Sequence, residues 1–405
     1  MSKNFFLVSL VLYTVAGVGQ PPVAQRPQTY IDTSFNPPTG VSWKAHTSTD
    51  FKKALESANP GDTIVLDAGA TYQGNFNLPA KTNPNNKWIY IVGSSLASLP
   101  APGTRVNPAT DAAKMPKIVT PNSVDTIELL SGANHYRFVG IEFYSASTVG
   151  CNPKAVPPVN CFTSGGLISS HAALNNLPDS IFIDRCYIHG QPNIDVHRGV
   201  QMIGTNFAIV DSYINEIHMQ GTETQAAAGW WGNGPFKIVN NYLSAAGEVV
   251  MFGGSGGVNN PTVPSDIEIR NNYFYLPLAW DAPGISLPPN PNNVIKNASS
   301  GVNFSPHEPY CSQVPGCTST GEVLRVIIRN NLFLLGDTTQ PGWSRGYGMG
   351  MLINPPNATD LVFQHNTVVP PAEPWILRTL GLFRSAHAAC LSVDAQCLDC
   401  GQRVV

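Results

Sequence analysis

An eight-residue pattern that recurs seven times constrains the fold of this chain more than any other feature. The first and third residues of each copy are large and apolar, while the second is free to be polar. This period of two is typical of a β-strand with one buried face. A short repeat period indicates an architecture in which each unit buries its apolar face against the next. The copies are Tyr136–Phe143, Ile181–Ile188, Phe207–Ile214, Phe236–Leu243, Ile267–Phe274, Val326–Phe333 and Leu361–Val368.

The spacing between copies gives the size of the repeating unit. Successive copies start 45, 26, 29, 31, 59 and 35 residues apart. The shorter spacings fit one coil of three short strands with their turns, and the longer ones imply insertions at 147–164 and 278–320 that form groove walls. Recurrent glycines among β-branched and aromatic residues argue against helical coils. We therefore predict an all-β fold, a single-stranded right-handed parallel β-helix over residues 48–370.

Position six of the pattern is Asn in four copies, at Asn241, Asn272, Asn331 and Asn366. Asn tolerates the left-handed backbone of a tight corner, and stacked Asn side chains can hydrogen-bond from coil to coil. We assign these residues to structure and not to chemistry. A further strand follows each corner, and we expect these strands to bear the groove. They are Gly166–Ser169, Gly199–Ile203, Thr224–Ala228, Glu248–Phe252 and Gly350–Ile353.

The two ends of the chain differ from the repeats. Residues 1–24 resemble an export signal, with Lys3 before an apolar run that is shorter than a membrane span of about 20 residues; an uncleaved anchor is the alternative. Residues 25–47 are a Pro-rich linker that need not fold, leading into the solenoid. Apolar residues at helical spacing predict a helix over Asp50–Ala58 that caps the N-terminal end. The repeats stop near residue 370, which leaves 371–405 as an irregular tail.

Composition narrows the class of partner. Charged residues are 12% of the chain and the net charge is −3, which gives no electrostatic basis for binding nucleic acid. Four of the eight cysteines form two pairs that bracket loops, Cys151 with Cys161 and Cys311 with Cys317, and these pairs fit an oxidising compartment. Cys186 lies inside a repeat and is predicted to be a buried apolar residue. We predict a secreted protein, extracellular or periplasmic, that is monomeric and has no membrane span after signal cleavage.

The repeats and the N-terminal motifs together resemble secreted parallel β-helix proteins of the pectate lyase-like superfamily. Residues 48–92, with the helix and Asn59-Pro-Gly-Asp-Thr-Ile-Val-Leu66, are similar to the alginate lyase and chondroitinase B group. Residues 133–265 are similar to bacterial secreted β-helix proteins of uncharacterised activity, through Asp184–Gly190, Gly234–Tyr242 and Ala245–Gly254. The resemblance implies the fold and a polysaccharide substrate. It carries over no catalytic residue, because the arginine motif of pectate lyases and the aspartate motifs of polygalacturonases are absent.

The densest polar set lies in three consecutive coils. If Arg198, Gln225 and Glu248 start their strands in register, they lie above one another about 4.8 Å apart. Such a column can bind a sugar acid or a cation; a surface ion pair between Arg198 and Glu248 is the structural alternative. The expected catalytic residues are His197, Arg198, His218 and Glu248. The expected substrate-binding residues are Gln225, Trp230, Trp231 and His189. The expected metal ligands are Asp195, Glu216 and Glu223, with Ca²⁺ as the metal and no organic cofactor.

Three functions fit these residues. β-Elimination on an acidic polysaccharide such as pectin or alginate needs a group that neutralises the uronate, a base and a proton donor. Hydrolysis needs two carboxyl groups that flank the bond. A glycan-binding or adhesion module needs neither, because β-helices host both enzymes and binding proteins. We favour the lyase and keep the other two as alternatives.

Overall fold

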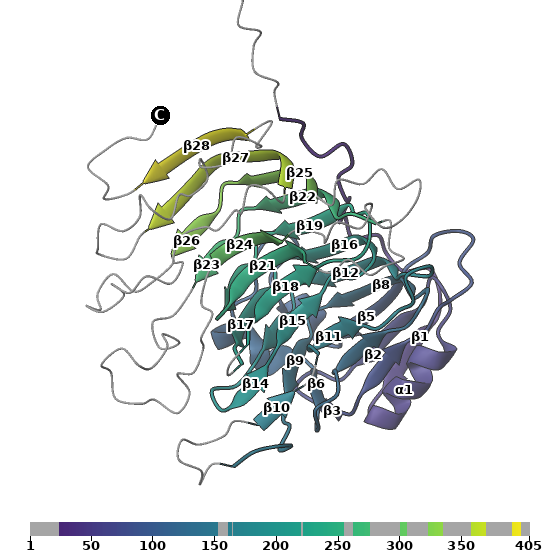
Figure 1. The fold of residues 1–405 in the computed structure, drawn as a ribbon. Helices are drawn as coiled ribbons and strands as arrows, with labels where there is room; N and C mark the ends of the chain where they lie inside the picture. Colours follow the sequence, from purple (N-terminus) through teal and green to yellow (C-terminus); the bar gives the residue numbers. More distant parts are fainter. Residues whose placement is uncertain are drawn as a thin grey trace, which may run out of the picture.

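The computed structural model describes residues 24–152, 161–163, 165–219, 222–254, 262–275, 300–305, 323–334, 358–369 and 391–397. These residues form a right-handed parallel β-helix, in which three stacks of parallel strands wind about one core. Figure 1 shows the strands layered from β1 and β2 at the purple end to β28 at the yellow end. The predicted fold class is confirmed.

The first two stacks join at β27 and form one large sheet. The first stack is β1 (Ser42–Ala45), β2 (Thr63–Leu66), β5 (Ile89–Gly93), β8 (Asn134–Val139), β12 (Asp179–Asp184), β16 (Thr205–Val210), β19 (Phe236–Val239), β22 (Ser265–Arg270), β25 (Val323–Arg329), β27 (Ala358–Val369) and β28 (Leu391–Cys397). The second stack is β3 (Thr71–Gln73), β6 (Lys117–Thr120), β9 (Glu142–Ser145), β13 (Tyr187–His189), β17 (Tyr213–Ile217), β20 (Tyr242–Ala245), β23 (Tyr273–Tyr275) and β26 (Leu332–Leu334).

The third stack is a separate sheet of seven strands. It consists of β4 (Phe76–Leu78), β7 (Ile127–Leu129), β11 (Ile168–Ser170), β15 (Arg198–Gln201), β18 (Gln225–Gly229), β21 (Glu248–Gly253) and β24 (Ser300–Ser305). A small pair, β10 (Cys161–Thr163) and β14 (Ile194–Val196), lies apart from these stacks. Four of the five strands expected in one sheet therefore share it. The fifth, Gly350–Ile353, lies outside the described residues.

The strand register agrees with the sequence repeat. Position one of each copy pairs with position one of the next, from Tyr136 opposite Ile181 to Val326 opposite Leu361. The side chains at positions one and three of every copy are buried and belong to the core. Each coil therefore buries its apolar face against its neighbours along the axis.

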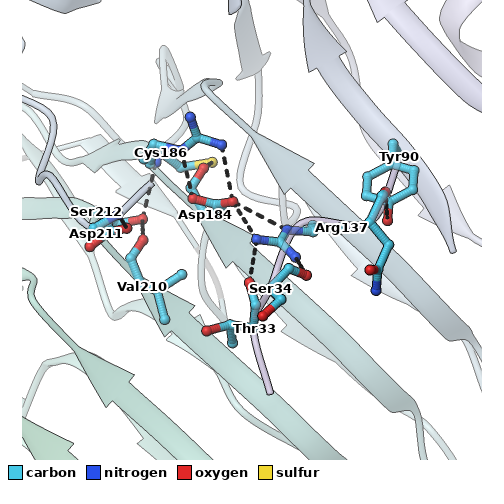
Figure 2. Close-up of polar contacts among 12 residues, drawn as sticks. Thr33, Ser34, Tyr90, Arg137, Asp184, Cys186, Val210, Asp211 and Ser212 are labelled. Carbon is cyan, nitrogen blue, oxygen red and sulfur yellow. Dashed lines mark hydrogen bonds and ion pairs between the residues drawn. The ribbon is translucent and has the colours of Figure 1, made fainter. Parts of the chain in front are cut away.

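The predicted Asn ladder exists, but the left-handed residue stands one position earlier than expected. Positive φ angles fall at position five, including Asn240, Asn271 and Asn330. Position six supplies the ladder, in which each Asn Oδ1 accepts the backbone N–H of the previous rung, as Asn272 does from Asn241 at 2.8 Å. The two positions have different tasks, because the residue at position five turns the backbone and the Asn at position six directs its side-chain amide into the core. Ser212 and Cys186 continue the column in earlier coils (Figure 2).

Cys186 has the predicted character of a buried small residue. Its thiol is fully buried, and burial raises its pKa to about 12. The predicted staple between Cys151 and Cys161 is a disulfide. The second predicted pair, Cys311 and Cys317, lies outside the described residues.

A helix is present where the sequence predicts one. α1 spans Ser48–Ser57, two residues earlier than expected, because Thr47 and Asp50 form a capping box at its start. Its inner face packs Phe51 and Leu55 into the solenoid core. That it serves as the cap of the solenoid remains a prediction. The other helical segments are η1 (Leu96–Ser98), α2 (Pro108–Asp111) and η2 (Ala112–Lys114), and none of the described helices is long and apolar enough to cross a membrane.

The expectation that the Pro-rich N-terminal segment need not fold is wrong for residues 24–36. This segment runs across the first stack and contacts strands far apart in the sequence. The backbone N–H of Gln25 donates to Asp360 at 3.0 Å, and Lys237 donates to the carbonyl of Ile31 at 2.9 Å. Arg137 donates to the carbonyls of Thr33 and Ser34 (Figure 2). The contacts satisfy backbone groups that a linker would leave to water.

Two boundaries of the solenoid also differ from the prediction. β1 pairs with β2 in parallel before residue 48, so the first coil begins earlier. β28 pairs with β27 in parallel, although the repeats are expected to stop near residue 370. β28 has apolar residues at its first and third positions, Leu391 and Val393, but its register shifts after Asp394, so that Ala395 and not an Asn stands opposite Asn366.

Candidate functional site

The expected column is present on the outer face of the third stack. Ala226 and Val249, one residue later on the same strands, belong to the core, so Gln225 and Glu248 point away from it. Gln225 Nε2 lies 4.0 Å from Sδ of Met251, which also points outward between the core residues Val250 and Phe252. Arg198 pairs with Gln225 across the strands, and the register of β18 on β21 places Gln225 beside Glu248. The predicted stacking of these three side chains is confirmed.

Glu248 and Gln225 form the firmest contact in the column. Gln225 is fully buried, and its Nε2 donates to Glu248 Oε2 at 2.7 Å. Asn303 Nδ2 donates to the other carboxylate oxygen at 3.4 Å. Burial, and next the charge of Glu223, raise the pKa of Glu248. Both of its oxygens are already engaged, so Glu248 fixes the orientation of the Gln225 amide.

Arg198 and His197 form the other end of the column. Arg198 Nη1 lies 3.1 Å from His197 Nδ1, and its guanidinium lies 4.8 Å from the ring centre of Trp230. Burial, and next the charge of Arg198, lower the pKa of His197 to about 4. His197 is therefore neutral at neutral pH. Because arginine can only donate, Nδ1 accepts and the ring proton is on Nε2.

Three buried polar atoms in this column lack a hydrogen-bond partner in the described structure. They are His197 Nε2, Arg198 Nε and Gln225 Oε1. Buried polar atoms almost always have partners, so three neighbouring exceptions require a reason. Two are donors and one is an acceptor. A bound molecule with a carboxylate and a hydroxyl group would satisfy all three.

His218, a predicted catalytic residue, lies away from this column. Its ring is buried between Asp195 Oδ1 at 3.8 Å and Glu216 Oε2 at 3.6 Å. Although burial opposes its charge, these two carboxylates raise the pKa of His218 to about 8. The imidazolium of His218 therefore lies between the two carboxylates.

The predicted calcium ligands do not form a site. Asp195 is on β14, Glu216 is on β17 of the second stack, and Glu223 precedes β18. Among the residues that the structure describes, no group of three or more His, Cys, Asp or Glu side chains could hold a metal ion. The described residues thus do not fit Ca²⁺, and no step of the chemistry below uses it.

The remaining predicted residues divide between two places. His189 ends β13 in the second stack, where its Nε2 contacts Glu142 at 3.1 Å and its ring stacks on Tyr187. Trp231 lies edge-on to Trp230, with ring centres 6.5 Å apart. Trp230 holds the guanidinium of Arg198 on one face, a contact that the sequence does not reveal.

Sequence reasoning missed three residues on this face. Asn303 lies on β24, inside the stretch 278–320 that the sequence predicts to be an insertion, and this strand matches no copy of the repeat. Asp125 and His171 form a contact of 2.9 Å beside β7 and β11. Both precede or follow strands of only three residues, which are too short to show a period. The sequence Gly165-Gly166 could have pointed to Asp125 and His171, because paired glycines at the start of a strand indicate that another chain segment approaches closely.

Comparison with known proteins identifies the fold. No protein-family model and no curated protein matches the sequence. The structure of pectate lyase Pel9A matches 89% of this chain and 78% of its own, at 10% identity and a TM-score of 0.51. The chain has the pectate lyase-like parallel β-helix fold.

Two further structures with this fold are similar at lower TM-scores. Alginate lyase from Paenibacillus sp. str. FPU-7 matches 82% of this chain and 87% of its own, at 14% identity and a TM-score of 0.40. The family 28 exopolygalacturonase of Yersinia enterocolitica matches 87% and 61%, at 12% identity and a TM-score of 0.44. At 10% identity, the match to pectate lyase Pel9A shows the fold alone, and the activity must be argued from the side chains of this chain.

Proposed function

We propose that the protein is an exported lyase that cleaves an acidic polysaccharide by β-elimination. The observation that carries the proposal is the set of unpartnered atoms at His197, Arg198 and Gln225. Two adjacent donors, one of them on a guanidinium, suit the carboxylate of a uronic acid. The amide oxygen of Gln225 suits a neighbouring sugar hydroxyl. Polymers of galacturonate and of mannuronate or guluronate carry both groups on every sugar.

The chemistry follows from charge. Elimination removes the proton on the carbon next to the carboxylate, and this proton becomes more acidic when the carboxylate is neutralised. Arg198 supplies the positive charge at a place where burial excludes water, which strengthens the interaction. His197 adds a neutral donor that carries no competing charge. Trp230 keeps the guanidinium in place through its ring face.

The test measures product and binding together. Purified protein is incubated with polygalacturonate, alginate and glycosaminoglycans, with and without a chelator. We expect ultraviolet absorbance to rise with at least one uronate polymer, because elimination leaves an unsaturated sugar. Arg198→Ala should lower activity by about 100-fold or more, which matches the loss of one charge-stabilising donor. Glu56→Gln, on the exposed face of α1, is the control and should leave activity unchanged.

Hydrolysis is the second candidate, and one observation favours it. Burial, and next the charge of Glu223, raise the pKa of Glu248, and a raised pKa suits the acid of a pair of carboxyl groups with divided acid and base roles. New reducing ends without ultraviolet absorbance would replace the lyase by a hydrolase. Binding to a uronate polymer with neither product would leave a glycan-binding module. No binding and no product from any polymer would contradict all three.

A further inference from the structure

A second polar pair lies on the same outer face, next to the strand of Arg198. Asp125 precedes β7 and has a side chain only 5% exposed, while the His171 side chain after β11 is 61% exposed. Asp125 Oδ2 lies 2.9 Å from His171 Nε2, and Asp125 Oδ1 accepts the backbone N–H of Gly166 at 2.9 Å. A buried carboxylate thus holds an exposed imidazole by one nitrogen.

The contact with Asp125 determines where the imidazole carries its proton. The Nε2–H donates to the carboxylate, so the lone pair of the neutral ring is on Nδ1. This leaves Nδ1 of an exposed ring free to accept a proton. His197 has the opposite arrangement, because Arg198 occupies its Nδ1 and leaves the proton on Nε2. The two histidines therefore offer one acceptor and one donor on the same sheet.

Two glycines bring this pair close to Arg198. A Cβ on Gly165 would lie 2.4 Å from Asp125 Oδ1, and a Cβ on Gly166 would lie 3.3 Å from Arg198 Cβ. The strands are hydrogen-bonded across this point, since Leu167 N–H donates to the Arg198 carbonyl and Ile127 N–H donates to that of Leu167. Any side chain at these positions would separate Asp125 from Arg198. Because residues 165 and 166 are both glycines, the Asp125 carboxylate and the Arg198 side chain can both lie against this backbone segment.

We propose that His171 is the base of the elimination and that Asp125 positions it; this rests on the proposed lyase function. With the uronate bound at Arg198, His171 Nδ1 takes the proton from C5. The electrons of the C5–H bond form the C4–C5 double bond, and the C4–O4 bond breaks with its electron pair on O4. The imidazolium, stabilised by Asp125, returns the proton to O4. No oxidant, metal or further reactant is needed.

The central experiment is chemical rescue in the full-length protein. His171→Ala should lower kcat on the cleaved polymer by about 100-fold or more, the usual contribution of a general base. KM should change little, because Arg198 and Gln225 still bind the sugar. Added imidazole should restore a concentration-dependent part of kcat, which a purely structural role would not allow. Because the His171 side chain is exposed, its replacement should leave the fold intact, and circular dichroism of the variant checks this.

A matched pair elsewhere on the surface controls for the loss of any histidine. His46 Nδ1 lies 2.7 Å from Asp67 Oδ2, and both side chains are exposed. His46→Ala and Asp67→Asn should leave kcat unchanged. Asp125→Asn should lower kcat with little change in KM, because the imidazolium loses its carboxylate while the sugar still binds at Arg198.

The outcomes separate the two proposals. If the wild-type protein yields unsaturated product and His171→Ala keeps its kcat, or imidazole restores nothing, His171 is not the base and the lyase function stands. If the wild-type protein yields no unsaturated product from polygalacturonate, alginate or glycosaminoglycans, the lyase function fails and the assignment of His171 fails with it. Rescue of His171→Ala by imidazole, together with a lowered kcat and an unchanged KM in Asp125→Asn, confirms both roles.

Discussion

Two columns of stacked polar residues run along this solenoid, and they differ in how completely they are satisfied. In the Asn ladder each buried amide donates to the next rung and to a core carbonyl, and accepts from the previous rung. In the column of Arg198, Gln225 and Glu248, buried atoms on two of the three residues have no partner in the part of the chain that the structure describes. Stacked polar residues therefore have two different roles in this solenoid. A satisfied column stabilises coils, while an unsatisfied one is prepared for a ligand.

The largest loss of stability is expected at Asp184, a buried carboxylate that is fully paired. Its carboxylate lies 2.6 Å from Arg137 and 2.8 Å from Arg185, and all three side chains are buried (Figure 2). Asp184→Ala leaves two buried guanidinium groups without their counter-ion, which should cost about 3–5 kcal/mol. Denaturant unfolding measures this cost. Asp32→Asn, an exposed aspartate, is the control; an equal effect of both variants would refute the role of burial.

The next largest effect is expected in the ladder itself. Asn272→Ala leaves the backbone N–H of Asn241 and the carbonyl of Ile238 without partners. An unsatisfied buried group costs about 1–3 kcal/mol, and because both groups are neutral we expect about 1–2 kcal/mol for each, so the free energy of unfolding should fall by about 2–4 kcal/mol. Asn77→Ala, at an exposed strand position, should change it by less than about 0.5 kcal/mol. A loss below 1 kcal/mol at Asn272 would mean that water replaces the rung.

Much of the ladder side could be predicted from the sequence, because it repeats. The apolar residues at positions one and three, and Asn at position six, occur at a fixed offset in each copy. The contacts of residues 24–36 could not be predicted, because Arg137 and Lys237 bind backbone carbonyls there, and any residue supplies a carbonyl. Asp125 and His171 were missed because they lie at the ends of three-residue strands. The column at Arg198 was predicted because its strands are longer.

A third prediction concerns His218, the buried histidine between Asp195 and Glu216. Since the folded-state pKa of His218 is raised from 6.5 to about 8, its protonation stabilises the fold fully below pH 6.5 and ceases to do so as the pH rises through about 8. The advantage of the wild-type protein over His218→Gln should therefore shrink by about 2 kcal/mol across that window. Unfolding titrations at several pH values measure this. A constant difference would show that Asp195 and Glu216 do not hold a cation.

The smallest change in stability is expected where the column is unsatisfied. In the double variant Gln225→Met with Glu248→Met, both partners of one buried hydrogen bond become apolar. Such a replacement is nearly neutral, within about 1 kcal/mol. The matched ladder variant, Asn272→Leu with Asn331→Leu, leaves backbone donors unpaired and should lose several times more.

The same double variant should nevertheless lose its affinity for uronate polymers, because Gln225 Oε1 disappears and the charge near Arg198 changes. Calorimetric titration with polygalacturonate or alginate, whichever the wild-type protein binds, measures this beside the unfolding experiment. A double variant that keeps its stability but loses its binding would show that the two columns have different roles. If the double variant instead unfolds as readily as the ladder variant, the column at Arg198 is a second structural ladder. Its unpartnered atoms would then belong to packing and not to a ligand.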